Sequence, residues 1–154
     1  MLAVASVTGW WFGTARRAVT PAVRVVDVLD GDTIVVALPG GGRDTVRLLG
    51  VDTPETHHPT EPVGCFGPEA AAFTQRRLAG RVVTLEGDVE SRDLYGRRLA
   101  YVTFQGERFN DVLLRRGFAR LLVIAPNRSH AHELLAAELS ARDAGRGLWG
   151  RCEP

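Results

Sequence analysis

The chain has 154 residues, of which 45% are hydrophobic and 24% charged, and 19 basic against 18 acidic residues leave a net charge of +1. This length and balance suit one folded domain and exclude a coiled coil, a collagen and a disordered tail. The charges are unevenly placed, because residues 1–90 hold 8 Arg and 11 acidic residues whereas residues 91–154 hold 11 Arg and 7 acidic residues. This indicates either a local acidic site and a later basic face, or simply the solvated surface of a neutral protein.

The first 22 residues form an apolar N-terminal segment. About a dozen mostly apolar residues open it, fewer than the roughly 20 that a bilayer span requires. Arg16 and Arg17 follow the apolar run, whereas a signal peptide carries its basic residues before it. Two explanations stay open: the remnant of an export signal or membrane anchor, which favours a secreted or extracytoplasmic protein, and an apolar tail that docks on the domain or on a membrane.

Three β-strands are expected next, over residues 24–28, 33–38 and 45–51. Each is rich in β-branched residues, and Asp, Gly and Pro turns separate them. The Pro-rich stretch 52–67 that follows is too irregular for a strand or helix, and its length is typical of a functional loop.

One helix and then two strands are expected in the next part of the chain. Pro68 starts a helix that ends at Gly80, and its apolar face is formed by Ala70, Ala71, Phe73 and Leu78. Residues 81–87 and 98–104 are expected as strands around the charged loop 88–97.

Two further helices are expected near the C-terminus. Asn110 is expected to cap a short helix that stops at Gly117. Ser129 is expected to cap a longer helix that ends before Gly145, with an apolar face formed by Ala131, Leu135 and Leu139.

Five strands with a helix between the third and fourth predict a mainly β (α+β) fold. A five-stranded barrel of the oligonucleotide-binding (OB) type, with three helices, fits this order. A doubly wound α/β sheet fits poorly, because short turns join the first three strands. We expect the barrel domain to span residues 23–150 and residues 151–154 to form a C-terminal tail.

Two aspartates are candidate metal ligands. Asp32 opens the second strand and Asp52 follows the third, so one end of the barrel can bring them together. With the backbone carbonyl of Thr53 and water, they offer the hard oxygen ligands that Ca²⁺ prefers.

Two arginines and a glutamate are candidates for catalysis on an anion. Arg47 and Arg97 could stabilise the added charge on a phosphodiester under attack. Glu55 could orient or deprotonate a water. When Arg47 and Glu55 are considered on their own, the competing explanation for them is a surface ion pair without a catalytic role.

Five ordered segments, VLDGDTIVV, VRLLGVDTPET, GPEAAAFT, DLYGRRLAYV and LLRRGFAR, resemble the micrococcal (thermonuclease, staphylococcal nuclease-like) family. The resemblance runs from about Val25 to Trp149. It implies an OB-type barrel with three helices and a Ca²⁺-dependent phosphodiesterase. Such an enzyme cuts DNA and RNA, with single strands preferred and little sequence preference, and leaves 3′-phosphate ends.

The resemblance also implies roles for particular residues. The metal ligands fall on Asp32, Asp52 and the carbonyl of Thr53. The two phosphate-binding arginines fall on Arg47 and Arg97, and the general base falls on Glu55. All six positions keep the residue type of the family, which favours catalysis over binding alone.

The departures from the family lie around the nucleotide. Tyr95 matches a tyrosine that contacts the nucleotide phosphate, but Leu94 stands where the family often has Lys. Residues 121–125 contain no Tyr where a relative has two that contact the base and a phosphate. We therefore expect weak binding of small nucleotides and dependence on longer substrates.

The two cysteines, Cys65 and Cys152, can form one disulfide or remain two thiols in a reducing compartment. Secreted relatives with cysteines at similar places would be bridged, and by this resemblance we predict that the two pair. Two other functions stay open beside the nuclease: a non-catalytic nucleic-acid-binding barrel, and a membrane-surface module carried by the apolar N-terminus. A monomer is the expected state.

Overall fold

The computed structural model describes residues 20–56 and 62–152. Most of the apolar segment expected over residues 1–22 lies outside these ranges, as do residues 153–154 of the expected tail. Thr20, near the start of the described chain, donates its backbone N–H to the carbonyl of Leu85 at 2.9 Å. No helix within the described ranges has the length and apolar character needed to cross a membrane.

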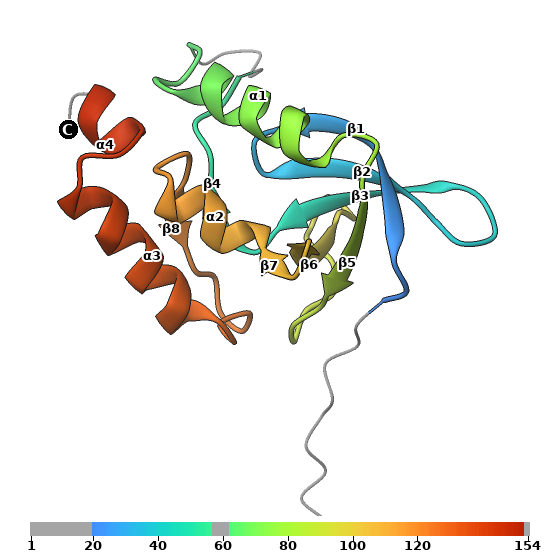
Figure 1. Ribbon diagram of the computed structural model, residues 1–154. Coiled ribbons are helices and arrows are strands. Elements are labelled where there is room, and N and C mark those ends of the chain that lie inside the picture. Colours follow the sequence, from blue (N-terminus) through green and yellow to red (C-terminus); the bar gives the residue numbers. More distant parts are fainter. Residues whose placement is uncertain (1–19, 57–61, 153–154) are drawn as a thin grey trace, which may run out of the picture.

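Five strands form a closed barrel at the centre of the molecule (Figure 1). They are β1 (Val23–Asp30), β2 (Thr33–Ala37), β3 (Arg43–Leu48), β5 (Val82–Glu86) and β6 (Arg98–Phe104). The sheet order is β3-β2-β1-β5-β6, and the two-residue β7 (Glu107–Arg108) extends it beyond β6. All neighbours in this order are antiparallel, whereas β3 closes the barrel by a parallel pairing with β6, with Val46 opposite Arg98. The predicted OB-type barrel is therefore confirmed.

The strand expected over residues 45–51 is divided in two, so that prediction was wrong in its continuity. β3 ends at Leu48, and the short β4 (Gly50–Asp52) leaves the barrel to pair with β8 (Arg120–Leu122). Gly50 has a φ of 73°, in the left-handed region that glycine adopts without strain. This turn redirects the chain, so Asp52 lies on β4 rather than on the barrel wall.

The described parts of the chain contain four helices: α1 (Gly67–Leu78), α2 (Phe109–Arg115), α3 (Ala131–Asp143) and the one-turn α4 (Leu148–Arg151). As expected, α1 begins with a proline in its first turn and buries Ala70, Phe73 and Leu78. It packs against β1, and α2 packs between β6 and α3. No sequence pattern predicted the short α4, which includes Arg151 of the expected tail.

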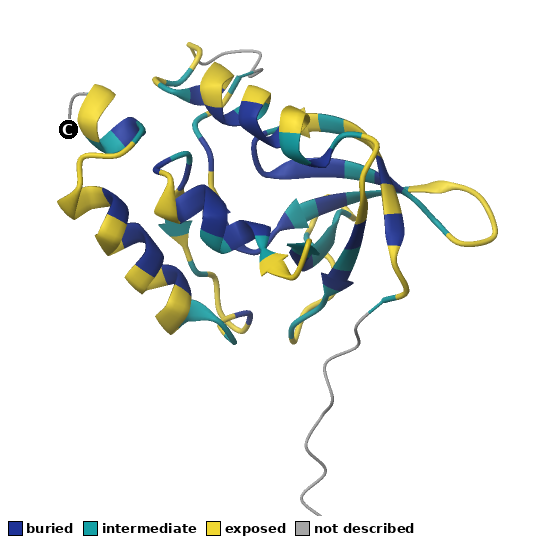
Figure 2. Cartoon of the chain, in the orientation of Figure 1, coloured by how far each residue is buried: buried dark blue, intermediate teal, exposed yellow. Residues whose placement is uncertain are grey.

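The apolar face predicted for α3 was wrong. Leu135 and Leu139 are 41% and 46% exposed, and Ala131 is only partly buried, whereas Leu134, Ala137 and Ala141 are buried. The buried face of α3 is therefore shifted by about one residue from the face that contains Ala131, Leu135 and Leu139 (Figure 2). Small residues such as Ala137 and Ala141 on the buried face suit the close packing of α3 against α2.

Neither predicted cap residue caps its helix. Asn110 lies inside α2, where its buried amide accepts a hydrogen bond from the Val102 N–H (2.9 Å) and donates one to the Leu49 carbonyl (2.8 Å). Ser129 precedes the N-cap of α3, and its hydroxyl donates instead to Asp88 at 2.6 Å. Both polar side chains join distant segments, which is why local capping rules mispredicted them.

The core fills the barrel and continues under the helices (Figure 2). Its fully buried residues include Val25, Ile34, Val36, Leu48, Leu85, Val102, Phe109, Leu113 and Leu134. Phe73 connects α1 to this core, because its ring stacks on Phe109 and Phe118 at centroid distances of 5.8 and 4.3 Å. The core thus holds the ends of β2, β3 and β4 in fixed positions.

Candidate active site

Asp32 is a buried carboxylate at the start of β2, only 5% exposed. Its Oδ2 accepts hydrogen bonds from both the backbone N–H (2.8 Å) and the hydroxyl (3.0 Å) of Thr53, and its Oδ1 accepts one from Thr33 at 3.0 Å. Such bonds fix the orientation of the carboxylate. The loop after β4 is thereby attached to the start of β2.

Arg47 brings the two predicted metal-ligand aspartates to one place. One of its terminal nitrogens lies 3.1 Å from Asp52 and 3.4 Å from Asp32. The other donates to the backbone carbonyls of Leu48 and Val51, each at 2.7 Å. The guanidinium is mostly buried, with 15% of the side chain exposed, so its direction is fixed before any substrate arrives.

A third carboxylate, Asp30, adds negative charge beside this pair. Loss of surrounding water raises the pKa of Asp52, and repulsion from Asp32 and Asp30 adds to it, against the attraction of Arg47 and Arg120. The pKa of Asp30 is raised in the same way, by burial first and then by Asp32. The three carboxylates therefore repel one another, a condition that a bound cation relieves.

The donor set fits a hard divalent cation in its chemistry. Asp32 and Asp52 approach one guanidinium nitrogen, and the carbonyl of Thr53 belongs to the same loop. No cluster of three or more His, Cys, Asp or Glu side chains with metal-site geometry occurs in the described part of the chain. Two carboxylates, a carbonyl and water match the oxygen ligands that Ca²⁺ and Mg²⁺ accept.

Arg97 and Tyr95 lie across a pocket from Arg47. The pocket measures about 500 Å³ and is bounded by the β3–β6 closure and by the loop before β6. Arg97 donates to Asp93 at 2.7 Å, and its guanidinium lies 5.3 Å from the centre of the Tyr95 ring. Asp93 also accepts the backbone N–H of Tyr95 at 3.0 Å, so one carboxylate positions both residues.

The pocket wall also contains the predicted departures from the family. Leu94 and Tyr95 are almost fully exposed, and Leu122 and Ile124 line the same pocket. Neither position 122 nor position 124 holds a tyrosine. The wall that Leu122 and Ile124 form is therefore aliphatic.

Glu55 is exposed and lies two residues beyond Thr53. Its backbone carbonyl accepts the N–H of Gly64 at 2.8 Å, which closes the loop that precedes α1. Its neighbour Pro54 lines a smaller pocket of about 200 Å³ together with Asp52, Arg120 and the two cysteines. The loop that carries Glu55 thus borders Asp52.

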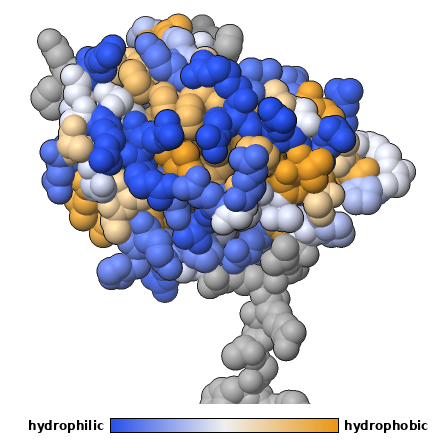
Figure 3. All heavy atoms as spheres, viewed as in Figure 1, coloured by the Kyte–Doolittle hydropathy of each residue, from blue (hydrophilic) through white to orange (hydrophobic). Residues whose placement is uncertain are grey.

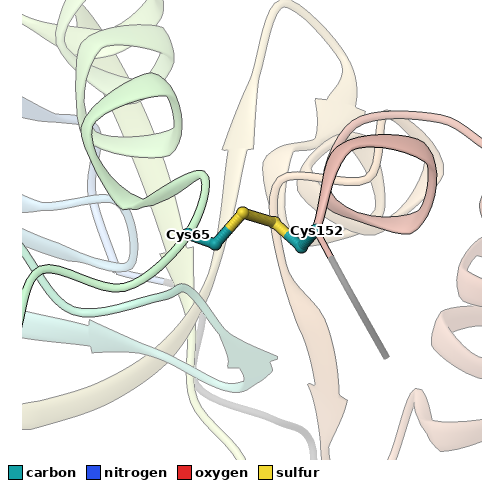
Figure 4. Close-up of a disulfide and its surroundings, with 2 residues drawn as sticks. All are labelled: Cys65 and Cys152. Atoms are coloured by element: carbon teal, nitrogen blue, oxygen red, sulfur yellow. A yellow bond between two sulfur atoms is a disulfide. The ribbon is translucent and has the colours of Figure 1, made fainter.

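Cys65 and Cys152 form a disulfide in the structure (Figure 4). The bond joins the loop before α1 to the residue that follows α4, at a sequence separation of 87. Because both cysteines line the smaller pocket with Asp52, the bond holds the Glu55 loop and the C-terminal helix beside the aspartates.

Sequence reasoning missed three residues of this site. Asp30 lies in the segment VLDGDTIVV, which also contains Asp32, and Asp93 opens the segment DLYGRRLAYV, which contains Tyr95 and Arg97. Arg120 ends the segment LLRRGFAR. The signal for Arg120 was its place at the end of that segment. Only the β4–β8 pairing, which sets Arg120 opposite Asp52, shows that it belongs to the site.

Comparisons with known proteins agree with this geometry. The family model described as "Staphylococcal nuclease homologue" matches residues 45–151, more than half of the chain. A protein named thermonuclease from Staphylococcus hyicus is 40% identical over 126 residues, covering 82% of this chain and 74% of that protein.

Two further relatives have similar names. A thermonuclease from Staphylococcus intermedius is 41% identical over 80% of this chain and 73% of its own length. Endonuclease YncB from Bacillus subtilis is 37% identical over 80% of this chain and 59% of its own length. With the barrel, the paired aspartates and the two arginines in place, these matches show that the chain belongs to the staphylococcal nuclease family.

Proposed function

We propose that the protein is a Ca²⁺-dependent nuclease that hydrolyses DNA and RNA with little sequence preference and leaves 3′-phosphate ends. The observation that carries this proposal is the position of Arg47. Its guanidinium forms ion pairs with both Asp32 and Asp52, and it lines the same pocket as Arg97. Cationic and anionic groups at one end of an OB barrel suit a phosphodiester and a divalent cation together. The nuclease and endonuclease names of the relatives support the same activity.

Each residue has a separate role in the proposed reaction. Asp32, Asp52 and the carbonyl of Thr53 would hold the cation, which supplies positive charge beside the reacting phosphate. Arg47 and Arg97 bind the nonbridging phosphate oxygens and stabilise the charge that builds up on them. The fixed direction of Arg47 avoids reorganisation during the reaction.

Glu55 accepts the proton of the attacking water. The water oxygen forms a new bond to phosphorus, and the bond from phosphorus to the 5′ oxygen breaks in line with it. The 5′ oxygen takes a proton and leaves as a hydroxyl, so the phosphate stays on the 3′ oxygen of the other fragment. An exposed carboxylate can reach such a water and exchange its proton with solvent afterwards.

Cleavage of a labelled single-stranded DNA of about 30 nucleotides tests this proposal. The parent protein is assayed at alkaline pH with Ca²⁺ and with EDTA, beside Glu55→Gln and the control Glu133→Gln on the exposed surface of α3. We expect Ca²⁺-dependent cutting, 3′-phosphate products by mass spectrometry, a loss of at least about 100-fold in Glu55→Gln and parent activity in the control. If the parent protein binds the DNA but does not cut it in a metal-dependent way, the nuclease proposal is wrong and the protein is a nucleic-acid-binding module.

The disulfide supports a further part of the proposal, namely that the protein works as a secreted or extracytoplasmic monomer. Disulfides persist in oxidising compartments and are rare in the cytosol. The mass of the native protein by light scattering tests the monomer. Detection of the protein outside the cytoplasm of its host, with the disulfide intact, tests the location, and a reduced cytoplasmic protein would contradict it.

A further inference from the structure

Two arginines and a tryptophan form a stack that begins at the active site and leads away from the barrel. Arg120 and Arg142 each lie against the ring of Trp149, at 4.6 and 4.7 Å from its centre. Arg120 comes from β8, Arg142 from the end of α3 and Trp149 from α4. We name these three residues the arginine–tryptophan stack.

The stack continues the row of charged groups of the candidate active site. Arg47 bonds to Asp52, and the β4–β8 pairing places Asp52 opposite Arg120. Arg120 lines the small pocket with Asp52, and its charge acts on the pKa of Asp52. The row therefore runs from Arg47 through Asp52 and Arg120 to Arg142.

The arginines of the stack are available to an anion. Both side chains are exposed, and neither makes an ion pair within 4 Å in the described parts of the chain. An arginine on an aromatic face keeps its donors free at the edge while the ring fixes its plane. Two such groups are therefore oriented to bind phosphate oxygens.

The surroundings of the stack are basic. Between residues 115 and 152 the sequence has seven Arg and three acidic residues, and one of the latter, Glu138, is buried and accepts the Leu121 N–H. Hydrophilic side chains, interspersed with hydrophobic ones, cover much of the face seen in Figure 3. This surface attracts a polyanion and has few acidic groups to repel it.

We infer that the arginine–tryptophan stack binds the phosphates of a single nucleic acid strand beyond the nucleotide in the active site. The inference rests on the proposed function for the identity of the ligand. It also accounts for how a pocket with an aliphatic wall holds its substrate, because backbone contacts outside the pocket replace base stacking inside it. The disulfide at Cys152 attaches the end of α4, the helix that carries Trp149, to the loop before α1.

Binding of oligothymidylates tests the inference without relying on cleavage. All variants are made in the Glu55→Gln protein, and fluorescence anisotropy measures binding of labelled 3-mer and 20-mer strands at several salt concentrations. The double variant Arg120→Gln/Arg142→Gln removes the two charges. The control is Arg43→Gln, an exposed arginine at the β2–β3 hairpin, which projects on the far side of the barrel from α3 and α4 (Figure 1).

We expect the double variant to bind the 20-mer about tenfold more weakly and the 3-mer with a clearly smaller loss, because Arg120 also borders Asp52. The Arg43→Gln control should bind both strands like the parent. The slope of the logarithm of the 20-mer binding constant against the logarithm of salt should fall by about 1.4, or roughly 0.7 for each charge removed. An unchanged 20-mer affinity and slope, or an equal loss for the 3-mer, would overturn the inference. If the parent protein, with Glu55 intact, binds the strand but does not cut it, only the proposed function is refuted.

Trp149 supplies a second test that leaves both charges in place. Trp149→Leu removes the aromatic face, and Trp149→Phe keeps one. The indole N–H has no hydrogen-bond partner in the described part of the chain, so the Phe variant loses no bond. We expect 20-mer binding to weaken severalfold in Trp149→Leu and to stay near the parent value in Trp149→Phe. Equal binding by both variants, with both shown to be folded by urea unfolding, would contradict a role for the ring.

Discussion

Thr53 donates both its backbone N–H and its hydroxyl to the same oxygen of Asp32, at 2.8 and 3.0 Å. Both residues are buried, at 3% and 5% exposure. The bonds fix the loop after β4 to the start of β2, and with it the carbonyl that we assign to the metal. In the proposed site, a single threonine thus orients one of the carboxylates that we assign to the metal and would supply a further ligand from its backbone.

Thr53→Val removes the hydroxyl while it keeps the shape of the side chain. Asp32 then loses one of its bonds in a buried place, and we expect the free energy of unfolding to fall by about 1–2 kcal/mol. Urea unfolding measures this change, and calcium titration of the folded protein should show weaker binding. Thr53→Ser keeps the hydroxyl and should bind calcium nearly as the parent does; equal weakening in both variants would argue against the bond.

Arg47 and Arg97 should respond differently to replacement by lysine. Arg47 uses both terminal nitrogens, on two carbonyls and on Asp52, and lysine cannot reproduce this fork. We expect Arg47→Lys to lower the free energy of unfolding by about 2–3 kcal/mol, and Arg97→Lys, in a more exposed loop, by less than about 1 kcal/mol. Both should lose cleavage activity. Equal stability losses in urea unfolding would show that the carbonyl bonds of Arg47 contribute little.

The barrel could be predicted from the sequence because its signals are local. Alternating β-branched runs and Gly-Asp turns identify strands wherever they pack, and Pro68 marks the start of α1. The rotation of α3 depends instead on the shape of α2, which Ala137 and Ala141 meet. The same holds for Asn110, whose amide joins β6 to the residue after β3 and therefore cannot act as a cap.

The candidate site was predicted less from local pattern than from resemblance. Carboxylates next to strand ends suggested Asp32 and Asp52, and the structure brings them together on Arg47. Arg120 could not be found in this way, because it reaches Asp52 only through the pairing of two three-residue strands that no periodicity predicts. The placement of Glu55 as the general base stays a prediction.

The stability contribution of Asp44 should depend on pH. Partial burial raises its pKa, but the bonds from Arg92 and Arg98 outweigh this and hold the pKa below its ordinary value of 3.8. Folding therefore favours the ionised form, so the stabilisation is complete above pH 3.8 and is lost as the pH falls through the lower, folded value.

Asp44→Asn should accordingly be less stable than the parent by about 1 kcal/mol near neutral pH, because the two arginines are partly exposed. This difference in the free energy of unfolding between Asp44→Asn and the parent should disappear in acid, where Asp44 of the parent is protonated. Urea unfolding from about pH 6 to about pH 2 measures it. The control Asp143→Asn, at the exposed end of α3, should show no loss, since an acidic group near a helix C-terminus is unfavourable. A gap that stays constant in acid would mean that the charge of Asp44 is not its source.

The disulfide should contribute strongly to stability. It closes a segment of 87 residues, and the loss of chain entropy in the unfolded state corresponds to about 4–5 kcal/mol. The double variant Cys65→Ser/Cys152→Ser should unfold at a lower urea concentration, and its free energy of unfolding should be lower than that of the parent by about 4–5 kcal/mol. Mass spectrometry of the parent after alkylation without reductant should show no modified cysteine, and two alkylated cysteines would contradict the bond.

A tyrosine on the aliphatic wall should restore binding of small nucleotides. Ile124 is 64% exposed and lines the same pocket as Tyr95. Ile124→Tyr adds a ring on which a base can stack, worth about 1–3 kcal/mol, so a nucleoside 3′,5′-bisphosphate should inhibit at least about fivefold more tightly. Leu135→Tyr, on the exposed face of α3, is the control. No gain in inhibition, or an equal gain in the control, would argue against stacking on this wall.

The parallel pairing of β3 with β6 has a consequence for how activity appears during folding. Arg47 lies opposite Leu99 in this ladder, two residues beyond Arg97, so both arginines take their places only when segments far apart in the chain meet. Contacts between distant segments require the closure of long loops and are slow to form. A partly folded chain that has completed only the β1–β2–β3 meander therefore carries Asp32 and Arg47 but lacks the opposite side of the pocket. In a refolding experiment, the return of cleavage would report the closure of the barrel rather than the first appearance of its strands.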